Sequence, residues 1–292
     1  MALEFFDTHC HLHELVSAHT PVHDKWLSDG APRTETSVLE SAARVGVSQM
    51  IVIGTTLEDS EAAVRFAQAH ENVWASIGIH PHEAKRYATT QKSRSVGLSS
   101  SEHKLVVAPE VVGRFGELVL EPKVVAVGEC GLDYFYSHSP KPEQETILRF
   151  QLELALRHDV PLSFHVRDAF DDFWPIFDDY PGVRGVLHSF TDSQENMERA
   201  VEQGLYIGVN GIATFTKDPV QLVIYRTIPQ QSLLLETDAP FLTPKPFRGT
   251  ICEPKHVLQT AQFLTELRGE DMTALAKACS TNAKRLFLPD SI

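Results

Sequence analysis

Residues 5–11 read FFDTHCH, an apolar run that leads directly into a His-x-His pair. The run is typical of a strand, and alternate side chains of a strand share a face, so Asp7, His9 and His11 can point the same way. Two imidazoles on one face suit a divalent metal ion, and a nearby carboxylate can bind the ion or orient a ligand. Surface or core histidines explain a lone His-x-His pair equally well, so the prediction depends on the rest of the chain.

Short apolar runs alternate with helical patterns along the whole sequence. The run at 48–55, SQMIVIGT, is continuous and β-branched, which is typical of a strand buried on both faces. After the first strand, we predict strands at residues 48–55, 73–79, 124–129, 161–165, 184–189, 205–209 and 232–237. We predict helices at residues 37–45, 58–70, 109–120, 142–158, 168–179, 193–203, 218–228, 254–268 and 271–286. Eight strand–helix units in one series predict an α/β chain folded as a single (β/α)8 TIM barrel over residues 1–292; six or seven strands would have favoured a doubly wound sheet.

Composition and charge restrict the class of protein. The 292 residues are 42% hydrophobic and 22% charged, as is ordinary for a globular protein. The net charge of −13 argues against a basic surface that binds nucleic acid without regard to sequence, although bound metal ions would reverse the field locally at a phosphate site. The four scattered cysteines, and the lack of a leader pattern or long apolar run, predict a cytoplasmic protein with reduced thiols and no membrane contact. No obligatory protein partner is expected.

Polar side chains stand at the ends of seven of the eight predicted strands. In strand order these are His9 and His11, His80 and His82, Glu129, His165 and Arg167, His188, Asn210, and Asp238. The carboxyl ends of barrel strands meet at one mouth, where the active sites of such enzymes are built. One histidine at a strand end is commonly a hydrogen-bonding residue, but this many ligand-type side chains at one edge predict a metal centre.

The mixture of imidazoles and carboxylates suits Zn²⁺ or Mn²⁺, while Mg²⁺ would favour more oxygen ligands. Six candidate ligands exceed what one tetrahedral ion needs, so we predict two divalent ions with Glu129 as a shared bridge. The ligands assigned to one ion are His9, His11, Glu129 and Asp238, and those assigned to the other are Glu129, His165 and His188. Asp238 is also a candidate general base for a metal-bound water. The chemistry predicted from these residues is that of a metal-dependent hydrolase.

Two further residues are candidates for direct catalytic roles. Arg167 follows His165 by two residues and could bind a phosphate through two hydrogen bonds, or could instead pair with Asp168 or Asp171. His80 directly ends its predicted strand, so it could contact phosphate or protonate the leaving oxygen.

The surroundings of the predicted mouth allow more than one interpretation. His82 could act as His80 does or could serve its loop. Asp133 could shape the pocket, and the aromatic residues at 134–136 could stack nucleobases or pack beneath a loop. Other histidines, among them His13 and His256, are expected on the surface.

Seven motifs resemble the TatD-type deoxyribonucleases in order and spacing. They are FDTHCHLH, SIGIHPH, AVGECGLDY, FHVRDA, VLHSF, YIGVNG and LLLETDAPFLTP. The resemblance runs over residues 6–287 and implies a TIM barrel that hydrolyses DNA phosphodiesters, usually as a 3′→5′ exonuclease on single-stranded or damaged DNA. It implies that the metal-site residues are His9, His11, Glu129, His165, His188 and Asp238, the set already reached from the residues themselves.

The chain departs from the family pattern in two places. Residues 248–254 read RGTICEP where the family usually has Arg-Asn-Glu-Pro, so that Cys252 replaces an amide. The connection at 82–123 is longer than usual, and its Lys92, Arg94 and Lys104 could contact a nucleic-acid backbone or belong to a solvated loop.

Two other functions compete with a nuclease. A metal-dependent amidohydrolase or esterase acting on a small molecule would be favoured by a lysine at the end of the fourth strand, where this chain has Glu129. A non-catalytic binding barrel would be indicated by lost ligands, and none of the six is lost.

Overall fold

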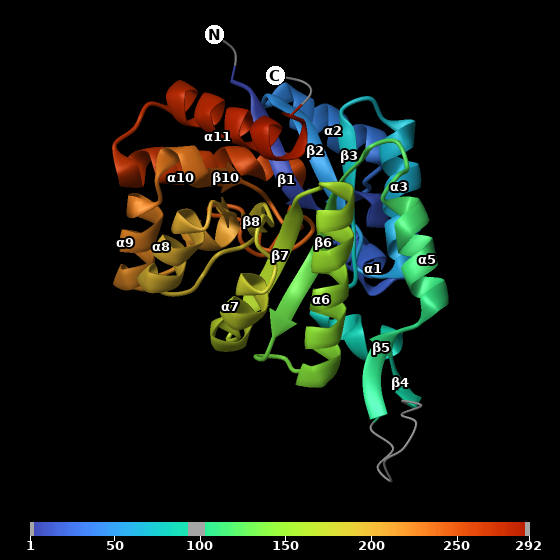
Figure 1. Cartoon of the computed structure of the whole chain (residues 1–292). Helices are drawn as coiled ribbons and strands as arrows, with labels where there is room; N and C mark the ends of the chain where they lie inside the picture. Colours follow the sequence, from blue (N-terminus) through green and yellow to red (C-terminus); the bar gives the residue numbers. More distant parts are fainter. Residues whose placement is uncertain (1–2, 93–102, 290–292) are drawn as a thin grey trace.

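The computed structural model describes residues 3–92 and 103–289 and contains one eight-stranded parallel sheet. The sheet runs in chain order apart from a two-stranded insertion, and helices surround it, so the predicted (β/α)8 barrel is confirmed (Figure 1). The barrel strands are β1 (Phe5–Cys10), β2 (Val47–Ile53), β3 (Val73–Ile77), β6 (Val124–Asp133), β7 (Leu162–Arg167), β8 (Gly185–Leu187), β9 (Tyr206–Val209) and β10 (Leu233–Leu235). That residues 1–292 act as one domain stays a prediction.

Helices follow the strands in the predicted order, with boundaries within a few residues of those expected. The helices are α1 (Pro21–Leu27), α2 (Glu35–Arg44), α3 (Leu57–Ala69), α4 (Ala84–Tyr87), α5 (Pro109–Leu118), α6 (Lys141–His158), α7 (Phe170–Asp178), α8 (Gln194–Glu202), α9 (Pro219–Thr227), α10 (Val257–Arg268) and α11 (Met272–Phe287). Short 3₁₀ turns lie at Leu12–Leu15, Pro81–Glu83, Gly211–Thr214, Gln230–Ser232 and Pro254–His256. In the described parts of the chain, no helix is both long and apolar enough to cross a bilayer.

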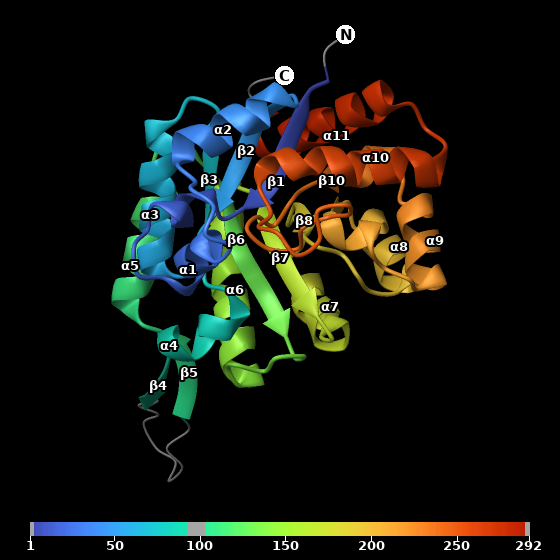
Figure 2. The ribbon, with the colours of Figure 1, turned by 180° about the vertical axis from the view of Figure 1, so that it is seen from behind.

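The barrel interior is apolar below the mouth. Phe6, Ile51 and Leu234 belong to a buried cluster that also includes Leu286 and Phe287 of α11. The helix α11 lies at the end of the barrel opposite to the arrowheads of β6 and β7, where it closes the interior (Figure 2). The apolar filling leaves only the opposite end, the mouth, for polar side chains.

The segment after β1 contains more structure than the polar composition of residues 12–36 indicated. A 3₁₀ turn and the helix α1 occupy it, and α1 begins at Pro21 after the N-cap Thr20. The Nε1–H of Trp26, a buried residue of α1, donates to the backbone oxygen of His11 at 3.0 Å. This hydrogen bond holds the backbone at His11, where the chain leaves β1.

The long connection between β3 and β6 carries an antiparallel hairpin that was not predicted. It consists of β4 (Ala88–Lys92) and β5 (His103–Val107), followed by the predicted helix at α5. Both views show the hairpin extending past the mouth end of the barrel (Figures 1 and 2). Of the basic residues proposed to contact nucleic acid, Lys92 ends β4 and the exposed Lys104 lies in β5, whereas Arg94 lies outside the described residues.

Asp7 closes the barrel between β1 and the end of β10. Its carboxylate accepts hydrogen bonds from the backbone N–H of Thr237 (2.9 Å), from the Thr237 hydroxyl (2.6 Å) and from the backbone N–H of His9 (3.3 Å). Beyond it, the N–H of Asp238 donates to the carbonyl of His9 at 2.8 Å. Burial raises the pKa of Asp7 to about 8, against three donors that favour its ionised form.

We expect Asp7→Ala to lower the free energy of unfolding by about 3 kcal/mol, because it leaves buried donors of Thr237 and His9 unpaired. Urea unfolding followed by tryptophan fluorescence would measure the change. Asp24→Ala, at an exposed position of α1, is the matched control and should leave the midpoint unchanged. An Asp7→Ala midpoint equal to that of the wild type would contradict a closing role for Asp7.

Candidate metal centre

The mouth of the barrel brings together all six side chains predicted to bind metal. Strands and the residues that follow them supply these side chains: His9 and His11 from β1 and its exit, Glu129 from β6, His165 from β7, His188 after β8 and Asp238 after β10. His9, Glu129 and His188 are buried, and each is less than 8% exposed.

Glu129 reaches the centre of the mouth through a bulge in β6. The register with β7 advances three residues on β6, from Val127 to Cys130, against two on β7. Gly128, inside the bulge, has a φ of +134°, and a Cβ there would lie 2.4 Å from the carbonyl oxygen of Ser163. Only glycine fits this approach, and the bulge it permits turns the next side chain into the barrel.

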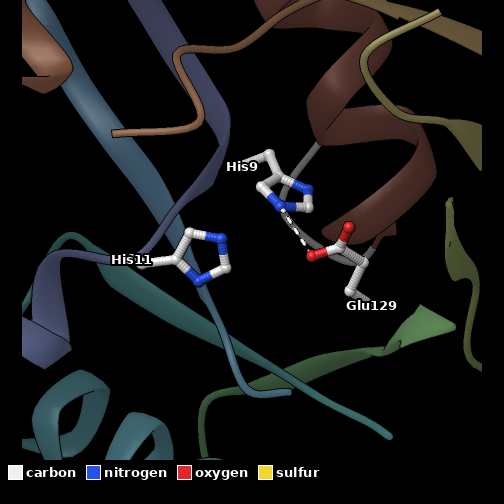
Figure 3. Close-up of side chains that lie close together, drawn as sticks. All are labelled: His9, His11 and Glu129. Carbon is white, nitrogen blue, oxygen red and sulfur yellow. Dashed lines mark ion pairs between the residues drawn. The ribbon is translucent and has the colours of Figure 1, made fainter. Parts of the chain in front are cut away.

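One carboxylate oxygen of Glu129 faces the His-x-His pair (Figure 3). His9 Nε2 lies 3.5 Å from Glu129 Oε2 and 3.6 Å from Asp238 Oδ1, and His11 Nε2 lies 3.4 Å from the same oxygen of Asp238. These separations are longer than ordinary hydrogen bonds. Donor atoms that each lie about 2.1 Å from one ion stand about 3 to 3.5 Å apart, so the spacing suits a shared ion.

The other oxygen of Glu129 faces a second group of histidines. Glu129 Oε1 lies 2.7 Å from His165 Nδ1, 3.1 Å from His188 Nε2 and 3.4 Å from His80 Nε2. Each oxygen of one carboxylate therefore faces its own set of imidazoles. This is the arrangement expected of a bridging ligand between two ions.

Contacts on the far side of the rings influence which nitrogens can bind an ion. His11 Nδ1 lies 3.1 Å from the carbonyl oxygen of Ile53, and His188 Nδ1 lies 3.3 Å from Glu236 Oε1. A neutral imidazole that donates from Nδ1 presents a lone pair at Nε2. In both residues Nε2 faces a carboxylate oxygen, so either a proton on that nitrogen or a cation between the two atoms must join them.

His9 gives the same indication by a different route. Its Nε2 is completely buried and has no hydrogen-bond partner within the part of the chain that the structure describes. A buried polar atom without a partner is costly, and a metal ion would satisfy it. The donor set of imidazoles and carboxylates therefore fits a divalent ion, or two of them around Glu129.

His80 differs from the other histidines in the direction of its hydrogen bonds. The backbone N–H of His82 donates to His80 Nδ1 at 3.1 Å, so a neutral His80 carries its proton on Nε2, which faces Glu129. Burial lowers the pKa of His80 to about 4, so the ring is neutral near pH 7. This geometry favours a neutral hydrogen-bond donor at the mouth over an imidazolium acid.

The two carboxylates among the candidate ligands, Glu129 and Asp238, are ionised. Burial opposes the ionisation of Glu129, yet the positive charges of nearby histidines and the hydrogen bond from His165 hold the pKa of its carboxyl well below the ordinary range. Burial likewise opposes the ionisation of Asp238, but the neighbouring imidazoles, His11 above all, lower the pKa of that carboxyl. Both groups can thus bind a cation near pH 7 without first losing a proton.

Two carboxylates orient the ligand histidines from behind. Asp133 Oδ2 lies 3.1 Å from His165 Nε2 and 3.0 Å from His82 Nε2. Glu236 Oε1 accepts from the backbone N–H of Ser189 at 2.6 Å beside its contact with His188, and its Oε2 has no partner among the described residues. A place at the pocket was predicted for Asp133, whereas Glu236 carries no signal in the sequence that separates it from Asp238.

A cavity of about 760 Å³ opens from the metal centre to solvent. Its lining includes Glu129, His165, Arg167 and Tyr136. The guanidinium of Arg167 lies over the Phe135 ring, 4.0 Å from its centroid, and makes no ion pair with any described carboxylate. The alternative of a salt bridge to a neighbouring aspartate on its own loop is therefore not seen.

Two expectations about residues outside the centre are wrong. His13 and His256, expected on the surface, are buried. His13 Nε2 lies 2.8 Å from Asp59 Oδ1, and His256 Nδ1 accepts from the backbone N–H of Glu253 at 3.0 Å, so each fills a polar position beneath a loop. The partner of His13 lies 46 residues away and leaves no local signal in the sequence, whereas Glu253 and His256 form a capping box within three residues.

Cys252, at the position where the TatD-type resemblance led us to expect asparagine, is fully buried beneath the loop that carries Asp238. Its Sγ lies 3.9 Å from the carbonyl oxygen of Thr237, and its backbone N–H donates to the Pro240 carbonyl at 3.2 Å. A thiol is a weak donor, so the backbone bond is the stronger of these two contacts.

Comparisons with known proteins agree with this geometry. A family model described as TatD related DNase matches residues 6–288. The chain belongs to the TatD related DNase family. The 3′-5′ ssDNA/RNA exonuclease TatD of Escherichia coli K12 is 34% identical over 260 residues, which cover 86% of this chain and 91% of that protein.

Two further relatives extend the match to almost the whole chain. A metal-dependent hydrolase of Bacillus subtilis, YabD, is 31% identical over 284 residues, covering 97% of this chain and 98% of the relative. The crystal structure of YjjV, a TatD homologue from Escherichia coli K12, is 29% identical and aligns with a TM-score of 0.78 over 98% of this chain and 99% of that chain. The resemblance inferred from the seven motifs is confirmed, and with it the prediction of a metal-dependent hydrolase of the nuclease class.

We expect Glu236→Gln to weaken metal binding about 10- to 100-fold, because it removes the charge that orients and polarises His188. Isothermal titration of the metal-free protein with Mn²⁺ would measure the affinity. Glu202→Gln, an exposed position at the end of α8, is the matched control. Loss of one whole ion would show that Glu236 is itself a ligand, and an unchanged affinity would contradict any role at the centre.

Proposed function

We propose that this chain is a two-metal phosphodiesterase that removes nucleotides from the 3′ ends of single-stranded DNA. The observation that supports the proposal most is that the two carboxylate oxygens of Glu129 face different histidines. Its Oε2 faces His9, and its Oε1 faces His165 and His188. A carboxylate shared in this way is suited to holding two ions about 3.5 to 4 Å apart, the separation used to bind the attacking and leaving oxygens of a phosphodiester. The proposed ligands are His9, His11, Glu129, His165, His188 and Asp238.

Two divalent ions, Mg²⁺, Mn²⁺ or Zn²⁺, would polarise the phosphate and lower the pKa of the attacking water. Asp238 is ionised, and its side chain is 15% exposed. It accepts the proton of that water. His80 donates a hydrogen bond from Nε2 to a phosphate or leaving oxygen. Arg167, at the cavity wall and without an ion-pair partner among the described residues, binds phosphate.

The substrate class is supported by the relatives, while the net charge bears only on the strength of binding. The proteins called 3′-5′ ssDNA/RNA exonuclease TatD match this chain over most of its length. With a net charge of −13, the chain gains little long-range attraction for DNA, so we expect weak binding that depends on the metal centre and falls with added salt.

The cysteines support a cytoplasmic location for the protein. All four cysteines are buried and unpaired, which supports a reducing, cytoplasmic environment. The proposal needs no protein partner, since all of the proposed catalytic groups come from one chain.

Digestion of a 5′-labelled single-stranded oligonucleotide tests the proposal. With Mg²⁺ or Mn²⁺ we expect a ladder that shortens from the 3′ end, and with EDTA no digestion. A duplex with blunt ends should be digested more slowly. If the folded, metal-loaded protein digested no nucleic acid, the proposal would fail and hydrolysis of a small ester or amide would take its place.

A further inference from the structure

Two aromatic rings beside the cavity are unusually exposed. Phe135 and Tyr136, in the loop after β6, are 55% and 52% exposed, although apolar side chains of this size are commonly buried. Tyr136 lines the cavity, and the two rings meet edge to face with centroids 4.8 Å apart. We call this edge-to-face pair of Phe135 and Tyr136 the aromatic corner. It lies at the rim of the metal centre.

The loop does not need these rings in order to hold its shape. Asp133 Oδ1 accepts from the backbone N–H of Tyr136 at 2.8 Å, and the Ser139 hydroxyl donates to the carbonyl oxygen of His82 at 2.7 Å. The side-chain amide of Gln144 donates to the carbonyl oxygens of Asp133 (3.1 Å) and Ser139 (2.7 Å). Polar bonds therefore set the loop. Tyr136 also contacts the rings of His82 (5.6 Å between centroids) and His138 (5.7 Å), yet half of the surface of Phe135 and of Tyr136 remains exposed.

The same bonds fix the corner relative to the metal ligands. One carboxylate oxygen of Asp133 holds Tyr136 through its backbone, while the other lies 3.1 Å from Nε2 of the ligand His165. A group that rests on the corner is thereby held at a set position from the reacting phosphate.

Arg167 adds a cation to this corner. Its guanidinium carbon lies 4.0 Å from the centroid of Phe135 and 4.9 Å from that of Tyr136. The stacking holds the plane of the guanidinium, and with no ion pair to a described carboxylate its N–H groups stay available to an anion. A nucleotide offers a base and a phosphate. An aromatic face can stack the base, and a guanidinium beside it can bind the phosphate.

We propose that Phe135, Tyr136 and Arg167 form a nucleotide subsite, in which the aromatic corner stacks an unpaired nucleobase and Arg167 binds a phosphate of the same strand. The inference rests on the proposed function and adds to it the origin of single-strand preference. A base within a duplex has both faces covered by its neighbours, whereas an unpaired base can turn onto a side chain. The alternative occupant, a protein partner, would cover the rings without responding to the base.

Fluorescence of 2-aminopurine tests the subsite without requiring hydrolysis. A single-stranded oligonucleotide ending in 2-aminopurine, with a methylphosphonate as its last linkage, is titrated with the metal-loaded protein. We expect quenching on binding to the wild type, and loss of the quenching with a roughly tenfold higher Kd for the double variant Phe135→Leu, Tyr136→Leu. Tyr136→Phe, which keeps the ring, should retain the quenching.

Arg167→Gln separates the phosphate part from the base part. This variant should keep the quenching but lower the slope of log Kd against log salt by about 0.7, the contribution of one phosphate on a single strand. Tyr180→Leu is the matched control for the double variant Phe135→Leu, Tyr136→Leu. Tyr180 follows α7 at the amino end of the barrel, and the guanidinium of Arg149 lies 6.0 Å from its ring centroid, so it is an arginine-stacked ring far from the cavity.

The outcomes distinguish the two proposals. Equal quenching and equal Kd for the wild type and the double variant would overturn the subsite, whatever the protein digests. Quenching by a wild type that digests no oligonucleotide would support the subsite and overturn the proposed function instead. An effect of Tyr180→Leu as large as that of the double variant would also overturn the subsite, because the loss would then be unrelated to its position.

Discussion

Glu129→Gln is expected to lower kcat/KM for single-stranded DNA about a thousandfold and to reduce the bound metal from two ions to at most one. Glu129 Oε2 faces His9, and its Oε1 faces His165 and His188, so one side chain serves both halves of the centre. An amide has no charge to share and offers only one oxygen to a cation. A loss of about 4 kcal/mol of transition-state stabilisation, the scale of a metal contribution, corresponds to a thousandfold in rate. Initial rates with a labelled oligonucleotide and metal content by mass spectrometry measure the two effects.

The matched control is Glu110→Gln, which changes the same side chain at an exposed position in the first turn of α5. It should keep both the activity and two ions per chain. A Glu129→Gln protein that folds normally, keeps two ions and loses less than tenfold in kcat/KM would contradict the bridge. Loss of activity with both ions retained would instead place Glu129 at the reacting groups rather than between the ions.

The fold could be predicted from the sequence because its signals are local. Runs such as 48–55 are apolar on both faces, which indicates a strand that is covered on both sides. Eight such runs occur along the chain, with helical patterns between them. The ends of these runs then place the ligands, since parallel strands bring their carboxyl ends to one edge. The positions of His9 and Asp238 at one mouth follow from this rule, whereas Glu129 lies inside β6, which continues to Asp133, and needs a bulge to reach the mouth.

The insertions could not be predicted with the same rule. The helix α1 buries Trp26, but its face is short and its neighbours are polar, so periodicity gave no signal. Thr20 followed by Pro21 was a readable N-cap and first-turn pair. The hairpin of β4 and β5 pairs outside the barrel, in a segment without strong alternation of polar and apolar residues.

The partners behind the ligands were the hardest part of the site to predict. Glu236 stands two residues before Asp238 in LLLETD, and the sequence alone does not say which of two carboxylates on one strand end faces the mouth. Its contact with His188 joins residues 48 positions apart, and the bulge that aims Glu129 depends on the close approach of Gly128 to Ser163. These are properties of packing, which spacing along the chain does not encode.

Asp238→Asn is expected to lower kcat on single-stranded DNA by about 10²- to 10⁴-fold, the range for loss of a general base. Asp238 Oδ1 lies 3.4 Å from His11 Nε2 and 3.6 Å from His9 Nε2, so it can bind the same ion as the His-x-His pair. An asparagine oxygen can still contact a cation, but it cannot accept a proton from water. Single-turnover rates, with metal content measured on the same samples, test the prediction.

Metal content decides which role of Asp238 accounts for the loss. If the variant keeps two ions while kcat falls, Asp238 acts as the proton acceptor, because the centre is intact and only the base is missing. If one ion is lost and excess Mn²⁺ restores the rate, Asp238 acts mainly as a ligand for the ion beside His9 and His11. Asp171→Asn, at an exposed position in the first turn of α7, is the matched control and should behave as the wild type. A kcat for Asp238→Asn within about threefold of the wild type would exclude both roles, since neither a base nor a ligand can be removed at so small a cost.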